Sequence, residues 1–300
     1  MNNEIAVCII TYKRPILLRK CIESLEKQTY KFDLYIIDND NEYSAERVVK
    51  FIQHDSEIKL NYKLEKIKGI PYARNRAINI VKSDYKYLAF IDDDEVAEKD
   101  WLENLKKTLE KYDADIVAGP VYPIIKSYHP KWLKDYFEGS KHKTGKHIKT
   151  CATGNVLMKS SIFKNLRKPF LEKFKNTGGS DSHLFSFLYE SGNKIIWADN
   201  AIVRENIEEN RLTFKWFFLR SFRVGNSKAF SYKANKKYNK LLTGFIESFF
   251  KLILSIFIVI PFVFLYFLGF KKQYLKIIKR LIKSIGFIAG ILGYKYEDYV

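Results

Sequence analysis

Hydrophobic positions in the first 120 residues follow two alternating patterns. Short apolar runs predict five strands, at 5–11, 32–38, 58–64, 85–92 and 114–120, and the continuous β-branched run at 5–11 is typical of a strand buried on both faces. Between these runs, apolar residues recur at helical spacing, which predicts helices at 16–28, 44–52, 71–81 and 101–112. Strands and helices in alternation predict an α/β fold, with a mostly parallel sheet covered by helices on both faces.

The pattern becomes less regular after residue 120. We expect a strand running into a helix, a helix closed by glycine, a strand pair, and an aromatic and cationic helix, at 153–163, 181–192, 194–206 and 211–230 in turn. The composition then changes, so the sequence predicts a catalytic domain over 1–230 and a basic, hydrophobic region over 231–300.

This C-terminal region is expected to associate with a membrane. Residues 252–270 form 19 positions without charge, enough to cross a bilayer, and a buried core helix is the less favoured interpretation. Lysines flank the run on both sides and Pro261 lies at its centre, which favours a re-entrant hairpin over a single crossing. Residues 271–294 resemble a basic amphipathic helix lying on anionic lipid. Residues 245–294 would thus hold the protein at the cytoplasmic face of the inner membrane.

The net charge of the chain is less informative than where the charged residues lie. The chain of 300 residues has 52 basic and 34 acidic side chains, a net charge of +18, yet residues 206–300 alone hold 17 basic and 5 acidic ones. Positive charge beside an apolar tail favours anionic lipid as a partner over nucleic acid. Three scattered cysteines predict no disulfide scaffold. The start of the chain does not read as a secretory signal, because Glu4 precedes a short apolar run.

The most informative polar cluster follows the strand at 85–92. Asp92, Asp93, Asp94 and Glu95 are consecutive, and adjacent carboxylates repel one another unless a cation lies among them. Their oxygens suit Mg²⁺ or Mn²⁺, which commonly complete their coordination with substrate phosphates. A solvated acidic loop is the alternative. The position at the carboxyl edge of the sheet, where ligands of such folds bind, favours the metal site.

Other polar residues end neighbouring strands or begin helices at the same edge. Asp38 is suited either to a nucleotide hydroxyl or base, or to turn formation, and these two readings are equally good. Thr11 and Arg14 offer a hydroxyl and a guanidinium, while Arg74 begins a helix and would approach a pyrophosphate or remain a surface charge. No glycine-rich phosphate loop follows the first strand, which argues against Rossmann dehydrogenases and P-loop NTPases.

Asp181 opens the helix at 181–192 and has two readings. It either caps the helix or acts as a general base facing an acceptor. The five histidines show no spacing typical of a metal site.

Taken in order, these motifs resemble those of family 2 glycosyltransferases of the GT-A fold, near the bacterial succinoglycan-type exopolysaccharide and lipopolysaccharide enzymes. The resemblance covers roughly residues 4–230, and its specificity comes from the joint order of individually modest motifs at 8–15, 36–40, 69–77, 89–95, 152–158, 178–185 and 203–225.

The resemblance implies transfer of a sugar from a nucleoside-diphosphate sugar, usually with inversion. It places Asp38 at the nucleotide base, with Thr11 and Arg14 nearby, and it assigns Asp92 to the ribose. Arg74 and Asp93 are expected to belong to the same nucleotide-sugar site.

The resemblance assigns the metal to Asp94, as Mn²⁺ or Mg²⁺ bridging the two phosphates, and the catalytic base to Asp181. Ser180 stands where the family usually has Glu, which places the acceptor contacts of that Glu in question. Glu205 occupies a position where many relatives carry a metal-binding His, and it carries little weight as a ligand.

The membrane-associated tail predicts a glycan acceptor that is linked to lipid. The helix at 213–223 would either line the approach to that acceptor or simply pack. The competing functions are a membrane-bound nucleotidyltransferase, which normally has the glycine-rich loop that is absent here, and a polyanion-binding protein, suggested by the net charge of +18.

Overall fold

The computed structural model describes residues 3–126, 129, 136–137, 141–267 and 271–297, and of 256–267 and 271–272 it describes the backbone alone. The chain forms two compact units, which are described separately below. The first consists of Met1–Ile124, Glu138–Lys175 and Ser180–Asn206, and the second of Ile125–Phe137, Asn176–Gly179 and Ile207–Val300.

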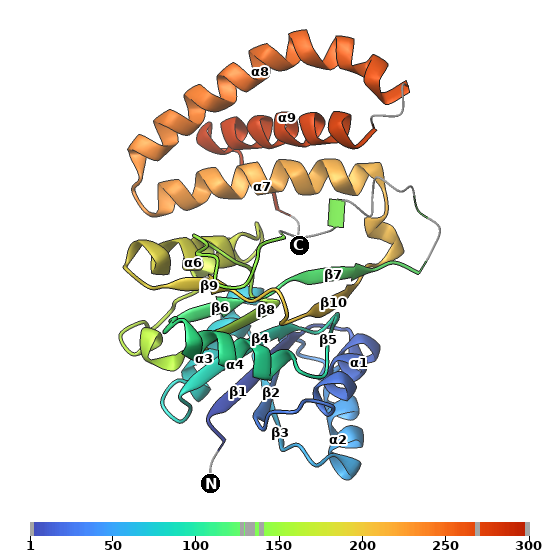
Figure 1. Cartoon of the computed structure of the whole chain (residues 1–300), viewed down its shortest axis with the longest axis vertical. Helices are drawn as coiled ribbons and strands as arrows, with labels where there is room; N and C mark the ends of the chain where they lie inside the picture. Colours follow the sequence, from blue (N-terminus) through green and yellow to red (C-terminus); the bar gives the residue numbers. More distant parts are fainter. Residues whose placement is uncertain (1–2, 127–128, 130–135, 138–140, 268–270, 298–300) are drawn as a thin grey trace. The chain divides into compact units, whose positions relative to one another are not determined.

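A seven-stranded sheet in the order β3-β2-β1-β4-β8-β6-β9 is the basis of the first unit (Figure 1). Neighbouring strands run parallel except at β8, which is antiparallel to both β4 and β6. The strands are β1 (Ile5–Thr11), β2 (Asp33–Asp38), β3 (Leu60–Leu64), β4 (Tyr87–Asp92), β6 (Ile116–Ala118), β8 (Asn155–Lys159) and β9 (Ile195–Trp197).

Helices cover both faces of this sheet because successive side chains of each strand point to opposite sides. Ile5, Val7 and Ile9 of β1 belong to one apolar cluster, while Ala6 and Cys8 belong to another. The first cluster includes helices α1 (Pro15–Leu25), α2 (Glu46–Asp55) and α4 (Trp101–Lys111), and the second includes α3 (Ile70–Val81) and α6 (Ser180–Glu190). The predicted mostly parallel sheet with helices on both faces is therefore confirmed.

One predicted segment differs in detail from the structure, and one short element was not predicted. The strand at 153–163 is β8, and a short 3-10 helix, η1 (Ser160–Phe163), follows it in place of an α-helix. A second 3-10 helix, η2 (Glu172–Phe174), precedes α6.

A second, three-stranded sheet was not predicted. Its order is β5-β10-β7, with β5 (Glu95–Ala97), β7 (Val121–Ile124) and β10 (Val203–Asn206). The predicted pairing within 194–206 is wrong, because β9 extends the large sheet beside β6 while β10 pairs with β5 and β7. A pattern of three or four residues is too short to indicate which strand a given strand pairs with.

Helices make up most of the second unit: α7 (Phe214–Ala234), α8 (Tyr238–Phe267) and α9 (Lys271–Ile291), preceded by a 3-10 turn, η3 (Glu209–Arg211). The backbones of α7 and α9 meet at glycines. A Cβ on Gly225 would lie 1.9 Å from the carbonyl oxygen of Lys283, and one on Gly286 would lie 2.1 Å from that of Phe222. Since α7 packs on α9, the structure divides the chain after Asn206, earlier than the predicted boundary at 230.

The predicted membrane segment at 252–270 falls mostly outside the residues whose side chains are described. Among the described residues, no helix has the length and apolar character needed to span a bilayer. Whether 252–270 crosses the bilayer or re-enters it stays a prediction.

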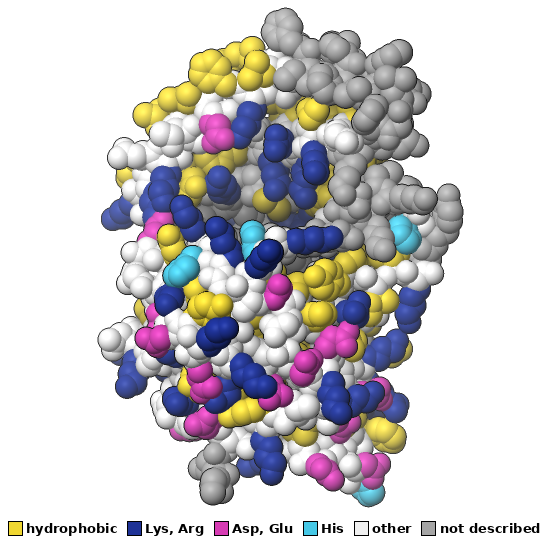
Figure 2. All heavy atoms as spheres, viewed as in Figure 1, with side chains coloured by type: hydrophobic (Ala, Val, Ile, Leu, Met, Phe, Trp, Pro, Cys, Tyr) yellow, Lys and Arg dark blue, Asp and Glu magenta, His cyan; other side chains and the backbone are white. Residues whose placement is uncertain are grey.

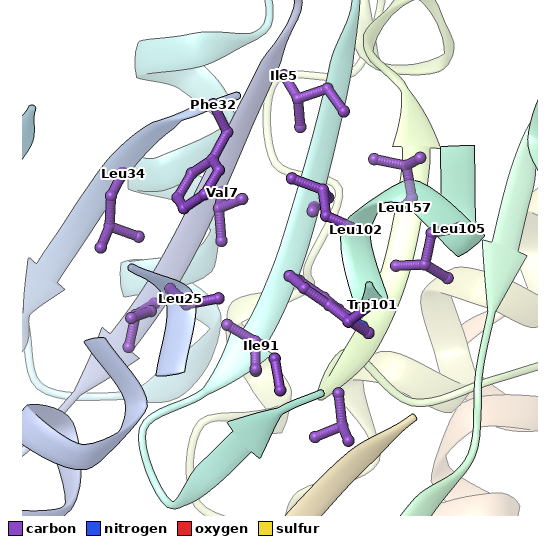
Figure 3. Close-up of a cluster of buried hydrophobic side chains, with 14 of the residues drawn as sticks. Ile5, Val7, Leu25, Phe32, Leu34, Ile91, Trp101, Leu102, Leu105 and Leu157 are labelled. Carbon is purple, nitrogen blue, oxygen red and sulfur yellow. The ribbon is translucent and has the colours of Figure 1, made fainter. Parts of the chain in front are cut away.

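Trp101 is fully buried in the apolar core of the first unit (Figure 3). Its Nε1 donates a hydrogen bond to Asn155 Oδ1 at 2.8 Å, so its removal should destabilise the fold strongly. Trp101→Ala should lower the free energy of unfolding by about 3–5 kcal/mol, because it leaves a cavity and an unpaired amide. Urea denaturation of both proteins measures the difference. Phe51→Ala is the control, since Phe51 is 62% exposed, and should stay within about 0.5 kcal/mol. Equal losses in the two variants would contradict this description of the core.

Candidate functional site

The four consecutive acids lie where the two sheets of the first unit meet. Asp92 is the last residue of β4 and Glu95 the first of β5, so Asp93 and Asp94 form the turn between them. Asn206 at the end of β10 fixes this turn, because its backbone N and its Nδ2 donate to the Asp94 carbonyl oxygen at 2.9 and 3.1 Å. The turn is thus anchored before any ligand binds.

Asp93 connects the turn to the end of β1. Its carboxylate accepts hydrogen bonds from Thr11 Oγ1 at 2.8 Å and from Arg14 Nη1 at 3.4 Å. The same guanidinium nitrogen donates to Asp94 Oδ2 at 3.1 Å. Burial raises the pKa of Asp93 to about 7, with a further contribution from the charge of Asp94, although Arg14 opposes the shift. Thr11 and Arg14, which the resemblance places near Asp38, thus contact Asp93 and Asp94 in the structure.

Arg74 on α3 joins the acids of β4 to α6. The side chain is buried, its Nη1 donates to Asp181 Oδ1 at 2.7 Å, and its Nη2 lies 3.5 Å from Asp92 Oδ1. Although the Asp92 side chain is 42% exposed, the protein around it removes part of its hydration, and this loss together with the charges of Asp94 and Asp181 raises its pKa against the effect of Arg74. Arg74 therefore does not project as a free surface charge; it holds two carboxylates that the sequence assigned to separate roles.

Three donors surround the Asp181 carboxylate. Besides Arg74, Ser180 Oγ donates to Oδ1 at 3.0 Å and Thr153 Oγ1 donates to Oδ2 at 3.2 Å. Burial alone would raise the pKa of Asp181, but Arg74 and the two hydroxyls outweigh it and hold the pKa below its usual value. Ser180, which stands where the family usually has Glu, thus supports the ionised form of its neighbour.

Glu95 has a structural position in this cluster. It is buried, its Oε2 accepts from the Asp92 backbone N at 2.8 Å, and its Oε1 would lie 2.4 Å from a Cβ on Gly154. Glu205 lies opposite it in the β5–β10 register. Burial, followed by the charges of Asp92, Asp94 and Glu205, raises the pKa of Glu95.

Asp38 lies apart from these contacts. The carboxylate has no exposed surface, and it accepts hydrogen bonds from the backbone N of Asp40, the backbone N of Ala45 and the hydroxyl of Tyr62, each at 3.0 Å. Its visible role is to shape the loop between β2 and α2. Because the carboxylate has no exposed surface, a nucleotide base would reach it only if the surrounding loop moved, so direct contact stays a prediction.

The donor set fits a hard divalent cation whose coordination a substrate completes. Among the described residues, no three His, Cys, Asp or Glu side chains are placed to ligate an ion. Mg²⁺ and Mn²⁺ sites on phosphorylated substrates, however, commonly use one or two carboxylates plus phosphate and water oxygens. Asp92 and Asp94 supply such oxygens in a turn whose negative charges raise each other's proton affinity, and a cation would relieve this repulsion.

A crowded acidic turn with two arginines, at the carboxyl edge of a parallel sheet, is typical of enzymes that bind phosphorylated nucleotides. Residues 6–167 match the model of Glycosyl transferase family 2, and the chain belongs to that family.

Relatives with assigned names support the same family. The chain is 30% identical to the succinoglycan biosynthesis protein ExoM of Rhizobium meliloti, over 76% of this chain and 74% of ExoM. It is also 30% identical to the glucosyl-dolichyl phosphate glucuronosyltransferase of Haloferax volcanii, over 76% of each chain.

Solved structures show that the fold is that of GT-A glycosyltransferases. The mannosyltransferase PcManGT of Pyrobaculum calidifontis, crystallised with GDP-Man and Mn²⁺, superposes with a TM-score of 0.68 at 14% identity, over 98% of this chain and 89% of that one. S. aureus TarS 1–349 with UDP-GlcNAc gives a TM-score of 0.53 at 13% identity, over 75% of this chain and 66% of that one.

Sequence reasoning did not assign site roles to three residues. Thr153 contacts the Asp181 carboxylate, Asn206 holds the acidic turn, and Tyr62 holds Asp38. Thr153 and Asn206 fall inside motifs that resemble the family, and this was the available signal. Tyr62 neither ends a strand nor belongs to one of these motifs.

The ion pair predicts a pH effect at Arg74. Because Arg74 lowers the pKa of Asp181, Arg74→Gln should raise it and shift the acidic limb of kcat/KM for sugar transfer to higher pH, by about one unit or more. Rate profiles over a pH series test this, with circular dichroism to check folding. Arg76→Gln, on the exposed side of the same helix, should leave the limb in place. If the folded Arg74→Gln variant kept the acidic limb of the wild-type protein, the assignment of Asp181 as a base whose pKa Arg74 lowers would be contradicted.

Proposed function

We propose that this chain transfers a sugar from a nucleoside-diphosphate sugar to a hydroxyl of a glycan acceptor, with inversion at the anomeric carbon. The observation that carries the proposal is the convergence of Asp92, Asp94 and Asp181 around Arg14 and Arg74 at one edge of a GT-A sheet. Membership of family 2, and relatives named for succinoglycan biosynthesis and for glucuronosyl transfer, support it.

In the proposed reaction, Asp181 takes the proton from the acceptor hydroxyl. The hydroxyl oxygen bonds to the anomeric carbon as the bond from that carbon to the diphosphate oxygen breaks, and the electron pair leaves with the nucleoside diphosphate. The lowered pKa of Asp181 keeps the base ionised at neutral pH, ready to accept the proton. Arg74 holds the base in place through its short contact at 2.7 Å.

The departing diphosphate accumulates negative charge, and the site is equipped to bind it. Asp94 would hold Mn²⁺ or Mg²⁺, which when bound stabilises the charge on the phosphates, and Asp92 beside it would contact the ribose or add a second ligand oxygen. PcManGT, a protein of the same fold, was crystallised with GDP-Man and Mn²⁺, which supports this choice of cofactor. Arg14, which pairs with Asp94 in the acidic turn, would contact the same phosphates.

A lipid-linked glycan is the proposed acceptor, in bacterial surface polysaccharide synthesis at the cytoplasmic face of the inner membrane. The support is compositional: residues 206–300 hold 17 basic and 5 acidic side chains beside the apolar run at 252–270. The relative named for glucosyl-dolichyl phosphate is consistent with a lipid-linked acceptor.

Release of a nucleoside diphosphate from candidate sugar nucleotides, measured with and without Mn²⁺, tests the donor half of the proposal.

Asp94→Ala is expected to abolish sugar transfer, by about 100-fold or more, because the variant loses the assigned metal ligand. Turnover of a nucleotide sugar under saturating Mn²⁺ provides the measurement. The matched control is Asp100→Ala, an exposed acid near the start of α4, which should retain full activity. Wild-type turnover by Asp94→Ala would remove Asp94 from the proposed mechanism.

Asp181→Asn should lower transfer by about 100- to 10,000-fold while leaving donor binding nearly unchanged, because the amide cannot accept the acceptor proton. Turnover and calorimetric titration with the nucleoside diphosphate separate the two effects. Asp199→Asn, an exposed acid of the same unit, provides the control. If donor affinity fell in parallel with rate, Asp181 would be a binding residue and not the base.

A further inference from the structure

The helix α8 leaves a continuous row of large apolar side chains exposed. These residues, here called the α8 stripe, are 37–66% exposed: Tyr238, Leu242, Phe245, Ile246, Phe249, Phe250, Ile253 and Leu254. Their separations of three and four residues place them along one side of the helix. Isolated exposed hydrophobic residues are ordinary, whereas a contiguous row of eight indicates a surface that something apolar covers.

A second feature of the same unit is a group of positive side chains on α7 and α9, which would bind negative charge. Four side chains form the α7/α9 cation cluster: Arg220, Lys228, Lys279 and Lys283. They come together because the two helices approach backbone to backbone at Gly225. In the part of the chain that the structure describes, none of the four forms an ion pair with a carboxylate; the pKa of Glu247 on α8 is lowered by its partner Lys251 and, to a smaller extent, by Lys228.

Two of these cations are half-buried and repel their neighbours. Lys279 Nζ lies 4.1 Å from the centroid of the Tyr136 ring. Burial, then the charges of Lys283 and Arg220, lowers the pKa of Lys279 to about 8. The pKa of Lys283 falls for similar reasons, with Lys228 and Arg220 as the charged neighbours. An anion placed among these groups would reverse the repulsion, and a phosphate has suitable charge and acceptor oxygens.

The two features lie on one helical unit and complement the two layers of a bilayer surface. Figure 2 shows hydrophobic side chains along α8 and a band of Lys and Arg over α7 and α9 beside them. Acyl chains would cover the first and anionic headgroups would pair with the second. The net positive charge of residues 206–300, with 17 basic against 5 acidic side chains, adds attraction over a longer range.

We propose that the helical unit binds the surface of a bilayer containing anionic phospholipid, with the α8 stripe entering the acyl boundary and the α7/α9 cation cluster binding headgroup phosphates. This inference rests on the proposed function, since it names the surface that would bring the transferase to a lipid-linked acceptor. It requires no segment to cross the membrane, and residues 238–255 together with α7 and α9 provide the contacts.

Flotation of the full chain with vesicles tests the cation cluster. Binding should be strong to phosphatidylcholine vesicles with about 30% phosphatidylglycerol, weak to phosphatidylcholine alone, and reduced as NaCl rises. Lys279→Gln/Lys283→Gln should weaken binding by roughly 25-fold, since each lysine near an anionic surface contributes about fivefold. Lys107→Gln/Lys111→Gln on α4 removes the same charge from the other unit and should change binding less than about threefold.

A second pair of variants tests the α8 stripe. Phe249→Ser/Phe250→Ser should weaken vesicle binding by about tenfold or more, whereas Phe51→Ser/Phe187→Ser, exposed phenylalanines of the other unit, should not. Equal losses in test and control pairs, equal binding to neutral and anionic vesicles, or a soluble dimer that covers the stripe and binds no vesicles would each overturn the inference.

Donor hydrolysis measured on the same samples keeps the two proposals apart. Loss of vesicle binding with intact metal-dependent release of nucleoside diphosphate overturns the surface alone. Vesicle binding without any donor turnover upholds the lipid surface and counts against the proposed transfer reaction.

Discussion

The structure of the site depends on how the carboxylates at the end of β4 are kept together. Four acids follow one another where two sheets meet, and three of them are buried: Asp93, Asp94 and Glu95. Charges removed from water in this way repel one another and favour protonation unless positive charge lies close by. Arg14 provides such charge for Asp93 and Asp94, and Arg74 provides it for Asp92. The two arginines are thus as necessary to the turn as the acids themselves.

Arg74 has a second consequence, because it also binds Asp181, 107 residues further along the chain. One buried guanidinium therefore fixes the distance between the acids of β4 and the carboxylate of α6. The same contact lowers the pKa of Asp181, which favours the ionised base and weakens its affinity for a proton. When a phosphorylated donor and its cation enter, the charges around Arg74 change, and the affinity of Asp181 for a proton changes with them.

The strands β1, β2 and β4 of the large sheet and the helices on its faces could be predicted, because these strands have six or seven residues, enough to show their pattern. IAVCIIT in β1 is an example: the pattern placed Thr11 at the carboxyl edge of the sheet, and the contact of Thr11 with Asp93 is a finding of the structure. The small sheet could not be predicted, because β5 has only three residues and β10 only four. This sheet nevertheless fixes the acidic turn, since Asn206 of β10 donates to the carbonyl oxygen of Asp94. Partners such as Arg74 and Asp181 are far apart in sequence, so their contact depends on packing that no local pattern records.

The central claim is that the acidic turn holds a divalent ion together with a nucleoside diphosphate. Isothermal titration calorimetry of Mn²⁺ into the purified chain, with and without UDP or GDP, tests it most directly. We expect weak Mn²⁺ binding by the protein alone and at least tenfold tighter binding, about 1.4 kcal/mol, when the nucleotide is present. Absence of Mn²⁺ and Mg²⁺ binding in the presence of either nucleotide would contradict it.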